Sequence, residues 1–558
     1  MFKHRLPIIA VLLLACGAFP PFANEAQPKT GSVGRQVTNA ITTQQPATQS
    51  PQTDAQQPDE NPSAFEVRLH PEDGIYVGEL VSFEVLAPED LDLSGEEIKI
   101  EVNGLVIGPA QFHRFGIGGR SQATFLWEWD TTSFDAGIHE LTFQVLPDGD
   151  SWMETVTLLP LEEMPLDSAN ADWTQIRTDC CIVYYVTGTE AERDIAELSS
   201  QIDLQADRAE EAMDTELEAP IPFVLMPRLL GHGGFASNEI YISYLDRNYA
   251  GENTTQVFHH EIVHVIDARL GGELRPSMLV EGLAVYLSDG HFKVEPLMER
   301  AVALLELDWY IPYETLADGF YFHQHEIGYI QASALTEYMV ERWGWEAYNN
   351  FYRDIKHHPS DSDYQAIDAG VRRHFDISFA ELEEDFLAVL RSLPVDPDLV
   401  ADVRLTVSFF DTVRRYQQVF DPSAYFLTAW LLNIEEMQEF DVTADYLRHP
   451  DEAANLALET MLVSADENLR AGRYGESERL LNAANAVLDV HESGLLQIFN
   501  AHPLAGNYYQ LVLTLLDNGY EPHEISISRN TAQVLVSRDG VELIGLSMSL
   551  NGESWSFD

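Results

Sequence analysis

The sequence His260-Glu261-Ile262-Val263-His264 constrains this chain more than any other feature. Histidines four positions apart on a helix lie on one face, about one turn apart, so both imidazoles can bind a single Zn²⁺. Glu261 then lies beside the metal and not on it, where a carboxylate can act as a general base. The pattern therefore predicts a helix that carries two zinc ligands and an acid–base residue.

A second helix is predicted a short distance along the chain, with Glu281 as the third zinc ligand. Apolar residues recur at helical spacing over positions 257–266, Asn253 to Thr255 offer N-caps, and Gly271-Gly272 offers an end. Pro276-Ser277 then begins an apolar stretch that contains Glu281. Two helices that bring together two histidines and a carboxylate satisfy a His₂Glu zinc site. A buried helix with incidental histidines is the alternative.

These two stretches, residues 258–267 and 277–286, together resemble the gluzincins, and in particular the bacterial peptidase MA-like domains, relatives of thermolysin and aminopeptidase N. The resemblance implies an α+β thermolysin-like metallopeptidase domain over residues 172–395. Sixteen residues separate His264 from Glu281, slightly fewer than in the best-known members, which fits a short loop between the helices. Carried over residue by residue, it implies a zinc site with the ligands His260, His264 and Glu281 and the catalytic base Glu261.

A hydrogen-bond donor is also needed to stabilise the oxyanion that forms during hydrolysis. Tyr329 begins a helix that looks like the one following the ligands in this family, and its phenol is our first candidate. His323 and His325, which come just before it, are further candidates. The alternatives are a core tyrosine and two exposed loop histidines.

Residues 233–242 form a glycine-rich loop that enters an alternating strand. In the resembled enzymes an edge strand before the zinc helix pairs with the extended substrate, so the resemblance implies substrate contacts at Gly234 and Ala236. An ordinary hairpin is the alternative. His259 points about 100° away from the ligand face and is expected to be structural. Asp267 either accepts a hydrogen bond behind a metal ligand or is an exposed helix residue, which we favour.

The N-terminal residues 1–23 are predicted to be an export signal, because basic residues precede an apolar run that is too short to span a bilayer. Residues 13–17, Leu-Leu-Ala-Cys-Gly, resemble a bacterial lipobox in which Cys16 would be acylated. Cleavage after Ala23 is the alternative. We therefore expect a membrane-anchored lipoprotein facing outside, or a secreted protein. Residues 24–63 are rich in Gln, Thr and Pro and are predicted to be a disordered tether.

The rest of the chain divides by composition into further domains. Residues 64–162 contain short alternating runs, and Asn103-Gly104 is a strong hairpin signal, so we expect an immunoglobulin-like β-sandwich. Residues 396–495 have helical spacing, and residues 496–558 predict a small α+β domain with one helix and two or three strands. The whole chain is thus expected to be multidomain. Any membrane attachment is expected through the N-terminus alone.

The formal net charge of −59 repels nucleic acid and anionic lipid headgroups, so we exclude nucleic acid as a partner. The same charge favours neutral or cationic peptides as substrates. The adjacent Cys180 and Cys181 are expected to be buried and unpaired, because neighbouring side chains on a strand point to opposite faces.

Together these features predict an exported zinc metallopeptidase that hydrolyses peptides or proteins. An endopeptidase is favoured over an aminopeptidase, because residues 234–240 lack the Gly-x-Met-Glu-Asn segment with which the resembled aminopeptidases hold a substrate amine. One alternative is a catalytically silent surface binding or adhesion lipoprotein that uses the domain as a scaffold. Another is zinc-dependent hydrolysis of a substrate other than a peptide. We make no prediction of the oligomeric state.

Overall fold

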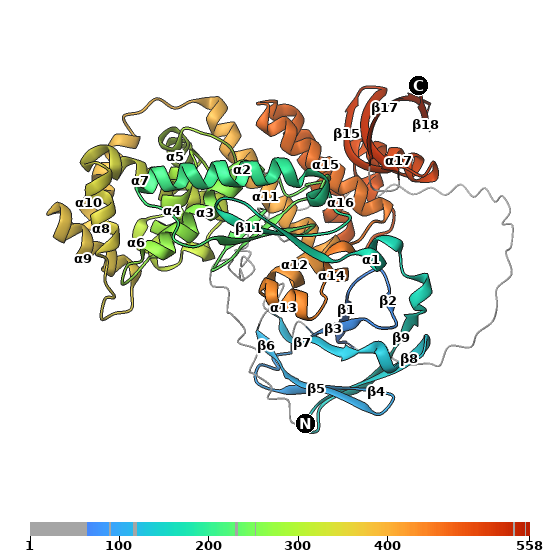
Figure 1. The fold of residues 1–558 in the computed structure, drawn as a ribbon. Helices are drawn as coiled ribbons and strands as arrows, with labels where there is room; N and C mark the ends of the chain where they lie inside the picture. The colour runs from blue at the N-terminus through green and yellow to red at the C-terminus, as the bar shows by residue number, and fades with distance from the viewer. Residues whose placement is uncertain are drawn as a thin grey trace, which may run out of the picture.

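The computed structural model describes residues 64–88, 91–114, 120–228, 233–251, 253–538, 542–552 and 554–558. The predicted signal segment, the lipidation site Cys16 and the predicted tether lie outside these ranges. Figure 1 shows a β-rich N-terminal part, a central body dominated by helices, and a small C-terminal sheet. Within the described ranges, no helix combines the length and apolarity needed to cross a membrane.

The β-rich N-terminal part consists of two sheets with strand orders β1-β3-β7-β6 and β2-β9-β8-β4-β5. Large side chains from both sheets, Phe83 and Phe143 among them, share one core. Asn103 and Gly104 have positive φ in the turn between β4 and β5, as the hairpin signal predicts. The immunoglobulin-like topology stays a prediction. The strands are β1 (Glu66–His70), β2 (Ile75–Tyr76), β3 (Leu80–Leu86), β4 (Glu97–Val102), β5 (Leu105–Gln111), β6 (His113–Arg114), β7 (Ser121–Asp130), β8 (Gly137–Leu146) and β9 (Ser151–Leu159).

A mixed sheet of order β10-β11-β12-β14-β13 follows the short helix α1 (Leu166–Asn170). Its central strands are parallel, while β10 and β13 join antiparallel at the two edges. Apolar side chains of the sheet pack in one core with helices α2 and α3. The elements are β10 (Trp173–Arg177), β11 (Cys181–Val186), α2 (Glu190–Met213), β12 (Ile221–Met226), β13 (Gly234–Ala236), β14 (Ile240–Ser243) and α3 (Thr254–Leu270).

Helices then follow one another to residue 390 and enclose the same core. Helix α4 packs on α3 and more extensively on α7, and α5 also packs on α7. The bounds are α4 (Ser277–Leu287), α5 (Leu297–Glu306), α6 (Tyr313–Asp318), η4 (Phe320–Phe322), α7 (His325–Trp343), α8 (Trp345–Arg353), α9 (Asp363–Phe375) and α10 (Phe379–Leu390).

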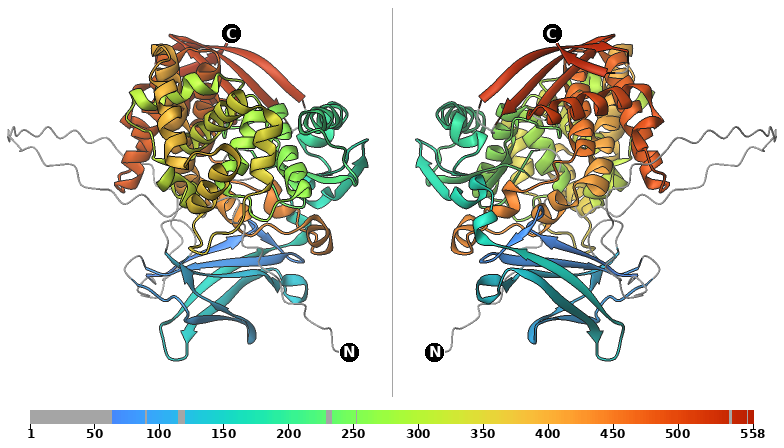
Figure 2. Two further views of the ribbon diagram at one scale, coloured as in Figure 1. Left: turned by 90° about the vertical axis from the view of Figure 1, so that its left-hand side faces the viewer. Right: turned by 90° about the vertical axis from the view of Figure 1, so that its right-hand side faces the viewer.

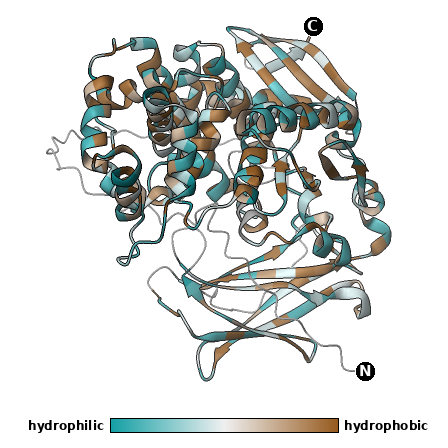
Figure 3. Cartoon of the chain, turned by 60° about the vertical axis from the view of Figure 1, so that its left-hand side comes forward, coloured by the Kyte–Doolittle hydropathy of each residue, from teal (hydrophilic) through white to brown (hydrophobic). Residues whose placement is uncertain are grey.

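The C-terminal elements form a second core that also includes Tyr249, Ala250 and Phe292 of the central body. Figure 2 shows the C-terminal sheet and the sandwich at opposite ends of the molecule, and Figure 3 shows hydrophobic and hydrophilic residues alternating along the strands of both. The sheet has a fourth strand, β18, beyond the two or three expected. The elements are α11 (Pro397–Phe420), α12 (Pro422–Ala429), α13 (Ile434–Glu439), α14 (Ala444–Leu447), α15 (Ala453–Arg470), α16 (Tyr474–Glu492), α17 (Pro503–Asp517), β15 (Glu521–Ser528), β16 (Thr531–Arg538), β17 (Glu542–Asn551) and β18 (Ser554–Phe557).

The prediction that Cys180 and Cys181 are unpaired is wrong, because the two form a disulfide. Only Cys181 belongs to strand β11, whereas Cys180 lies in the turn before it. The alternation of side chains along a strand therefore does not apply to this pair, and their sulfur atoms can meet.

Candidate metal centre

Two helices with clearly marked ends carry the metal-ligand candidates. The Asn253 side chain caps α3 by accepting from the amide of Gln256, and the helix stops at Gly271, whose φ is positive. Helix α4 begins at Ser277, directly after Pro276. Beside Glu281, Gly282 lets α4 approach α7 closely, because a Cβ there would lie 2.6 Å from the carbonyl oxygen of Ala332. The expected helix, turn and helix are therefore present.

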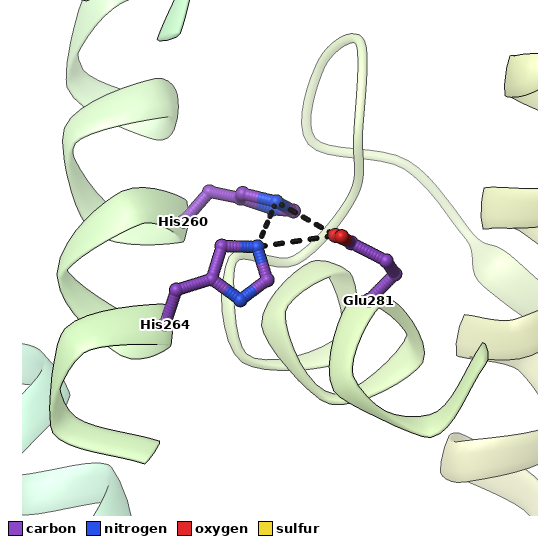
Figure 4. A group of neighbouring side chains, drawn as sticks. All are labelled: His260, His264 and Glu281. Atoms are coloured by element: carbon purple, nitrogen blue, oxygen red, sulfur yellow. Dashed lines mark hydrogen bonds and ion pairs between the residues drawn. The ribbon is translucent and has the colours of Figure 1, made fainter. Parts of the chain in front are cut away.

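The structure brings the three predicted ligands together, as Figure 4 shows. The Nε2 atoms of His260 and His264 lie 3.0 Å apart. Oε2 of Glu281 lies 3.4 Å from Nε2 of His260 and 3.1 Å from Nε2 of His264. One ligand atom from each residue thus lies within 4.8 Å of the others, which is compact enough for all three to reach one ion.

Two buried carboxylate oxygens support a cation at this place. Oε2 of Glu281 is buried against the two imidazoles, and Oε2 of Glu261 is buried without a hydrogen-bond partner among the residues that the structure describes. Burying a carboxylate oxygen without a partner is unfavourable. Two imidazoles and one carboxylate are also a donor set that zinc prefers, so the residues fit a zinc ion.

Without a metal, the electrostatics of the site place one positive charge among the ligands. Burial acts to lower the pKa of His264, but the Glu281 carboxylate outweighs burial and raises this pKa to about 9. Burial together with the neighbouring His264 lowers the pKa of His260 to about 4. The pKa of Glu281 lies well below its usual range, because His264 and His260 outweigh the effect of burial. Metal binding would therefore displace the His264 proton, which links zinc affinity to pH.

Glu261 lies beside the three ligands and is 5% exposed. Burial raises the pKa of its carboxyl to about 8. The nearby His264 acts to lower this pKa, and the Glu281 carboxylate acts to raise it. A carboxyl with a pKa near neutrality can both take and return a proton, which is what general acid–base catalysis needs.

Tyr321, in η4, is a site residue that sequence reasoning missed. Its hydroxyl donates to Oε1 of Glu281 at 2.6 Å, and Oε2 of the same carboxylate faces the two histidines. The tyrosine thus orients the proposed third ligand. No motif surrounds Tyr321 in the sequence, and only the packing of η4 brings it to α4.

The metal-ligand candidates open into a cleft of about 400 Å³. Its walls include Gly234, Ala236, His260, Glu261, His264, Glu281, His325 and Tyr329, all of which were singled out from the sequence. His323 and the buried His259 are not among the lining residues, so His323 is no longer an oxyanion candidate. Phe410, from α11, also lines the cleft, which means that the helical region after residue 395 contributes directly to the site.

Aromatic rings gather on one wall of this cleft. The ring of Tyr329 lies 4.1 Å from that of His325, 4.4 Å from that of His291 and 6.3 Å from that of His260. His291, which sequence reasoning did not select, belongs to the loop between α4 and α5. Both oxyanion candidates, Tyr329 and His325, therefore stand close to the metal-ligand candidates, and a third histidine stands with them.

Strand β13 forms another wall and lies at the edge of the mixed sheet. The carbonyl oxygen of Gly233 accepts from the amide of Ser243, and the amide of Ser237 donates to the carbonyl oxygen of Glu239, so both groups point toward β14. Between them, Phe235 pairs with Tyr241 of β14. Because backbone groups alternate in direction along a strand, those of Gly234 and Ala236 face the open edge. A Cβ on Gly234 would lie 2.6 Å from Ile242 and 2.9 Å from Val257, so packing against α3 already accounts for this glycine.

The expectation that Asp267 is an exposed helix residue is wrong. Asp267 is 1% exposed and bonds to Arg275, Arg353 and Tyr352, the last through a hydroxyl at 2.8 Å. Its carboxylate thus connects the end of α3 to Arg275, in the loop before α4, and to α8. Helical position alone did not reveal this, because its partners come from other segments.

Known proteins resemble this chain only distantly, and only in structure. No protein-family model matches the chain, and no curated protein matches it. An M1 zinc metallopeptidase from Deinococcus radiodurans is similar in structure at 13% identity and a TM-score of 0.28, over 59% of this chain and 94% of that one. An aminopeptidase N family protein from Idiomarina loihiensis is similar at 9% identity and a TM-score of 0.25, over 61% of this chain and 78% of that one. At these identities and TM-scores, the structural similarity gives no evidence about the activity of this chain.

Proposed function

We propose that this chain is a zinc-dependent peptidase of the gluzincin type, with His260, His264 and Glu281 as ligands. The observation that carries the proposal is the convergence of these three side chains beside the buried Glu261, on a cleft that one edge strand also lines. A metal site, a base and a place for an extended backbone are the parts that peptide hydrolysis requires.

Each part has a task in hydrolysis of a peptide bond. Zinc, when bound, supplies a Lewis acid that polarises the carbonyl and lowers the pKa of water. Glu261 takes the proton from the attacking water and returns it to the leaving amine. Tyr329 or His325 donates a hydrogen bond to the oxyanion, and the outward backbone groups of Gly234 and Ala236 pair with the substrate main chain.

We favour an endopeptidase for this activity. Among the residues that line the cleft, the carboxylates are Glu261 and Glu281, and both are already assigned to the metal and the base. Glu239 lies in the turn after the edge strand, and its carboxylate accepts from the Tyr241 hydroxyl and from the amide of Ile434. Among the described residues of the cleft, these contacts leave no spare carboxylate for a substrate amine, which supports the endopeptidase.

We further propose that the enzyme is exported and held at the outer face of the membrane by acylated Cys16, with residues 24–63 as a tether. The lipobox-like sequence and the polar composition of the following segment support this part of the proposal. Labelling with a radioactive or alkyne fatty acid tests it. The label is expected on the wild type and lost in Cys16→Ser, and equal labelling of both would contradict acylation at this residue.

The decisive experiment uses the purified protein with a mixed peptide pool and mass spectrometry. We expect internal cleavage that stops on chelation and returns with Zn²⁺. Glu261→Gln is expected to lower kcat by at least about 10²-fold while the zinc content stays at the wild-type level. Glu273→Gln, an exposed glutamate in the loop between α3 and α4, is the matched control and is expected to cleave normally.

A wild-type protein that holds zinc but cleaves no peptide of the pool would contradict the proposal. That result would favour the alternative, a silent surface binding or adhesion lipoprotein with this domain as a scaffold. The buried Glu261 speaks for catalysis, because a scaffold gains nothing from a costly buried carboxyl beside a metal. Stepwise removal of N-terminal residues from the peptides would show that the enzyme is an aminopeptidase and not an endopeptidase.

A further inference from the structure

One end of the cleft carries an arginine. Arg275, in the loop before α4, lines the cleft, and its side chain is 27% exposed. Among the described residues of the cleft lining, Arg275 is the one lysine or arginine. Its guanidinium bonds to Asp267, and the next residue, Ala268, lies one turn of α3 beyond His264 and lines the same end. The positive charge thus lies about one helical turn beyond the metal-ligand candidates.

The charge of Arg275 is not cancelled by its partner. Arg275 donates to Oδ2 of Asp267 through Nε at 2.8 Å and through Nη2. The other oxygen of this carboxylate forms an ion pair with Arg353 of α8 at 2.6 Å. One carboxylate between two guanidinium groups leaves an excess of positive charge. Arg353 is not among the residues that line the cleft, so Arg275 is the member of this cluster that presents the charge there.

The guanidinium of Arg275 is also held in position. Its two bonds to the buried Asp267 fix the plane of the group, so little conformational freedom is lost when a further acceptor binds. Its side chain also bonds to the hydroxyl of Tyr352. A guanidinium has more N–H donors than these two partners accept, and its flat fork matches the geometry of a carboxylate.

The opposite end of the cleft is different in character. Gly251 and Gln256, near the start of α3, line that end together with the rings of Phe292 and Phe410. Arg470, which is not part of the lining, donates to the carbonyls of Phe292 and Gly251 and so holds these two residues together. The cleft is therefore asymmetric, with aromatic rings beyond one side of the metal-ligand candidates and a cation beyond the other.

We propose that Arg275 forms a subsite for a carboxylate of the substrate. The proposal rests on the proposed function and narrows its substrate class to peptides with an acidic side chain, or a free C-terminal carboxylate, on one side of the cleaved bond. A helical turn advances about 5.4 Å and an extended peptide about 3.3 Å per residue. The carboxylate therefore belongs about one or two residues from the cleaved bond.

This preference is opposite to the one that the formal net charge of −59 favours. Surface carboxylates act at long range, and salt screens their field beyond about 8 Å at physiological ionic strength. A contact with Arg275 acts at hydrogen-bond distance inside the cleft. The two carboxylates of the described lining, Glu261 and Glu281, are assigned to the base and the metal, so a cationic side chain finds no partner there.

Peptide binding to the zinc-loaded, full-length Glu261→Gln protein tests the subsite without hydrolysis. The probes are fluorescent, C-terminally amidated peptides in which one glutamate is moved along the sequence, each with a matched glutamine peptide, and one neutral peptide with a free C-terminus. We expect glutamate at one position, or at two adjacent positions, to bind about 10-fold more tightly than glutamine, because a hydrogen bond between charged groups forms. Tighter binding of the free acid than of its amide identifies the C-terminal carboxylate as an occupant as well.

Adding Arg275→Gln is expected to abolish this discrimination, and Arg275→Lys to keep part of it, because a lysine retains the charge without the fork. Arg353→Gln is the matched control, since it removes the other arginine of Asp267 but no residue of the cleft lining, and it is expected to discriminate like the parent. Thermal melting of each variant separates loss of the subsite from loss of the fold. The comparison of glutamate with glutamine peptides on the parent protein needs no further variant to fold.

Equal binding of all glutamate and glutamine pairs, together with equal binding of free acid and amide, would overturn the proposal. A discrimination that persists in folded Arg275→Gln would overturn it too. The wild type is then given the same peptides. Discrimination in binding without any cleavage would support the carboxylate subsite and contradict the proposed function, whereas cleavage without discrimination would support the proposed function and contradict the subsite.

Discussion

At the scale of single residues, the two oxygens of Glu281 have different partners. Oε2 faces the imidazoles of His260 and His264, while Oε1 accepts a hydrogen bond from Tyr321 at 2.6 Å. A carboxylate held by one oxygen loses less conformational freedom when the other binds a metal. Tyr321 therefore orients the carboxylate of Glu281 through the oxygen that does not face the histidines.

Tyr321→Phe removes this hydrogen bond and leaves the ring in place. We expect the zinc affinity to fall by about 10- to 100-fold, because the ligand is no longer oriented. Competition with a chromophoric chelator measures this change. Tyr310→Phe is the matched control, since Tyr310 donates to Glu383 in the same way but does not line the cleft. Equal affinities of wild type and Tyr321→Phe would contradict the orienting role.

The raised pKa of Glu261 makes a prediction about the metal-free protein. Its pKa rises from an ordinary 4.5 to about 8 in the folded state, so the native protein binds this proton more tightly than the unfolded chain. The associated stability is present below the ordinary pKa and is lost as the pH rises through about 8. Glu261→Gln lacks this titrating carboxyl, so its stability does not have this dependence on pH.

The melting temperature of metal-free Glu261→Gln, minus that of the metal-free wild type, is therefore expected to grow between about pH 5 and about pH 9. Scanning calorimetry in chelator at several pH values measures it. A difference that shrinks or stays constant with rising pH would show that the carboxyl is ionised throughout.

At the scale of elements, the site depends on how α3, α4 and α7 are locked together. Asp267, at the end of α3, bonds to Arg275 in the connection to α4 and to Arg353 and Tyr352 of α8. Gly282 allows the close contact of α4 with α7. Helix packing of this kind fixes the angle between the helices and hence the distance from the two histidines to Glu281.

Asp267→Asn is expected to destabilise the protein by about 3 kcal/mol, because it leaves two arginines facing a neutral group in a buried setting. Urea unfolding measures the loss. Asp385→Asn, which breaks an exposed pair with Arg342, is the control and is expected to cost less than about 1 kcal/mol. Similar small effects of both substitutions would mean that the Asp267 cluster does not stabilise the helix pair.

At the scale of the whole molecule, the sandwich is joined to the body through α12 to α14. Arg448, just after α14, donates to the carbonyl of Gly74 at 2.9 Å and to Glu79, and its guanidinium lies 4.8 Å from the ring centroid of Tyr76. Nearby, the rings of His70 and Phe426 stack at 3.8 Å. The sandwich is therefore packed on the body through charged and aromatic contacts together.

Arg448→Met is expected to weaken this junction by about 3 kcal/mol, since it leaves the mostly buried Glu79 carboxylate without its cation. Limited proteolysis is expected to cut the segment of residues 160–172 faster, while the zinc content stays unchanged. Arg404→Met, which removes an exposed pair with Glu478, serves as the control. An unchanged cleavage rate in Arg448→Met would mean that the apolar contacts alone hold the sandwich.

Local signals in the sequence account for much of the fold around the site. Helical periodicity, N-cap candidates at residues 253–255 and a stop at residues 271–272 predict a helix where α3 lies, since capping and periodicity act over a few neighbouring positions. The hairpin at Asn103-Gly104 is predicted for the same reason. The disulfide of Cys180 and Cys181 was missed, because the alternation of side chains along a strand was applied to both cysteines although only Cys181 belongs to β11.

The pair His260 and His264 could be predicted from the sequence, because residues four apart on one helix share a face wherever that helix lies, and the second apolar helix nearby supplied Glu281. The presence of Tyr321, His291 and Phe410 at the cleft could not be predicted and is known only from the fold. These side chains come from a short helix, a loop and a distant helix. Their approach depends on how whole elements pack, which no local pattern encodes.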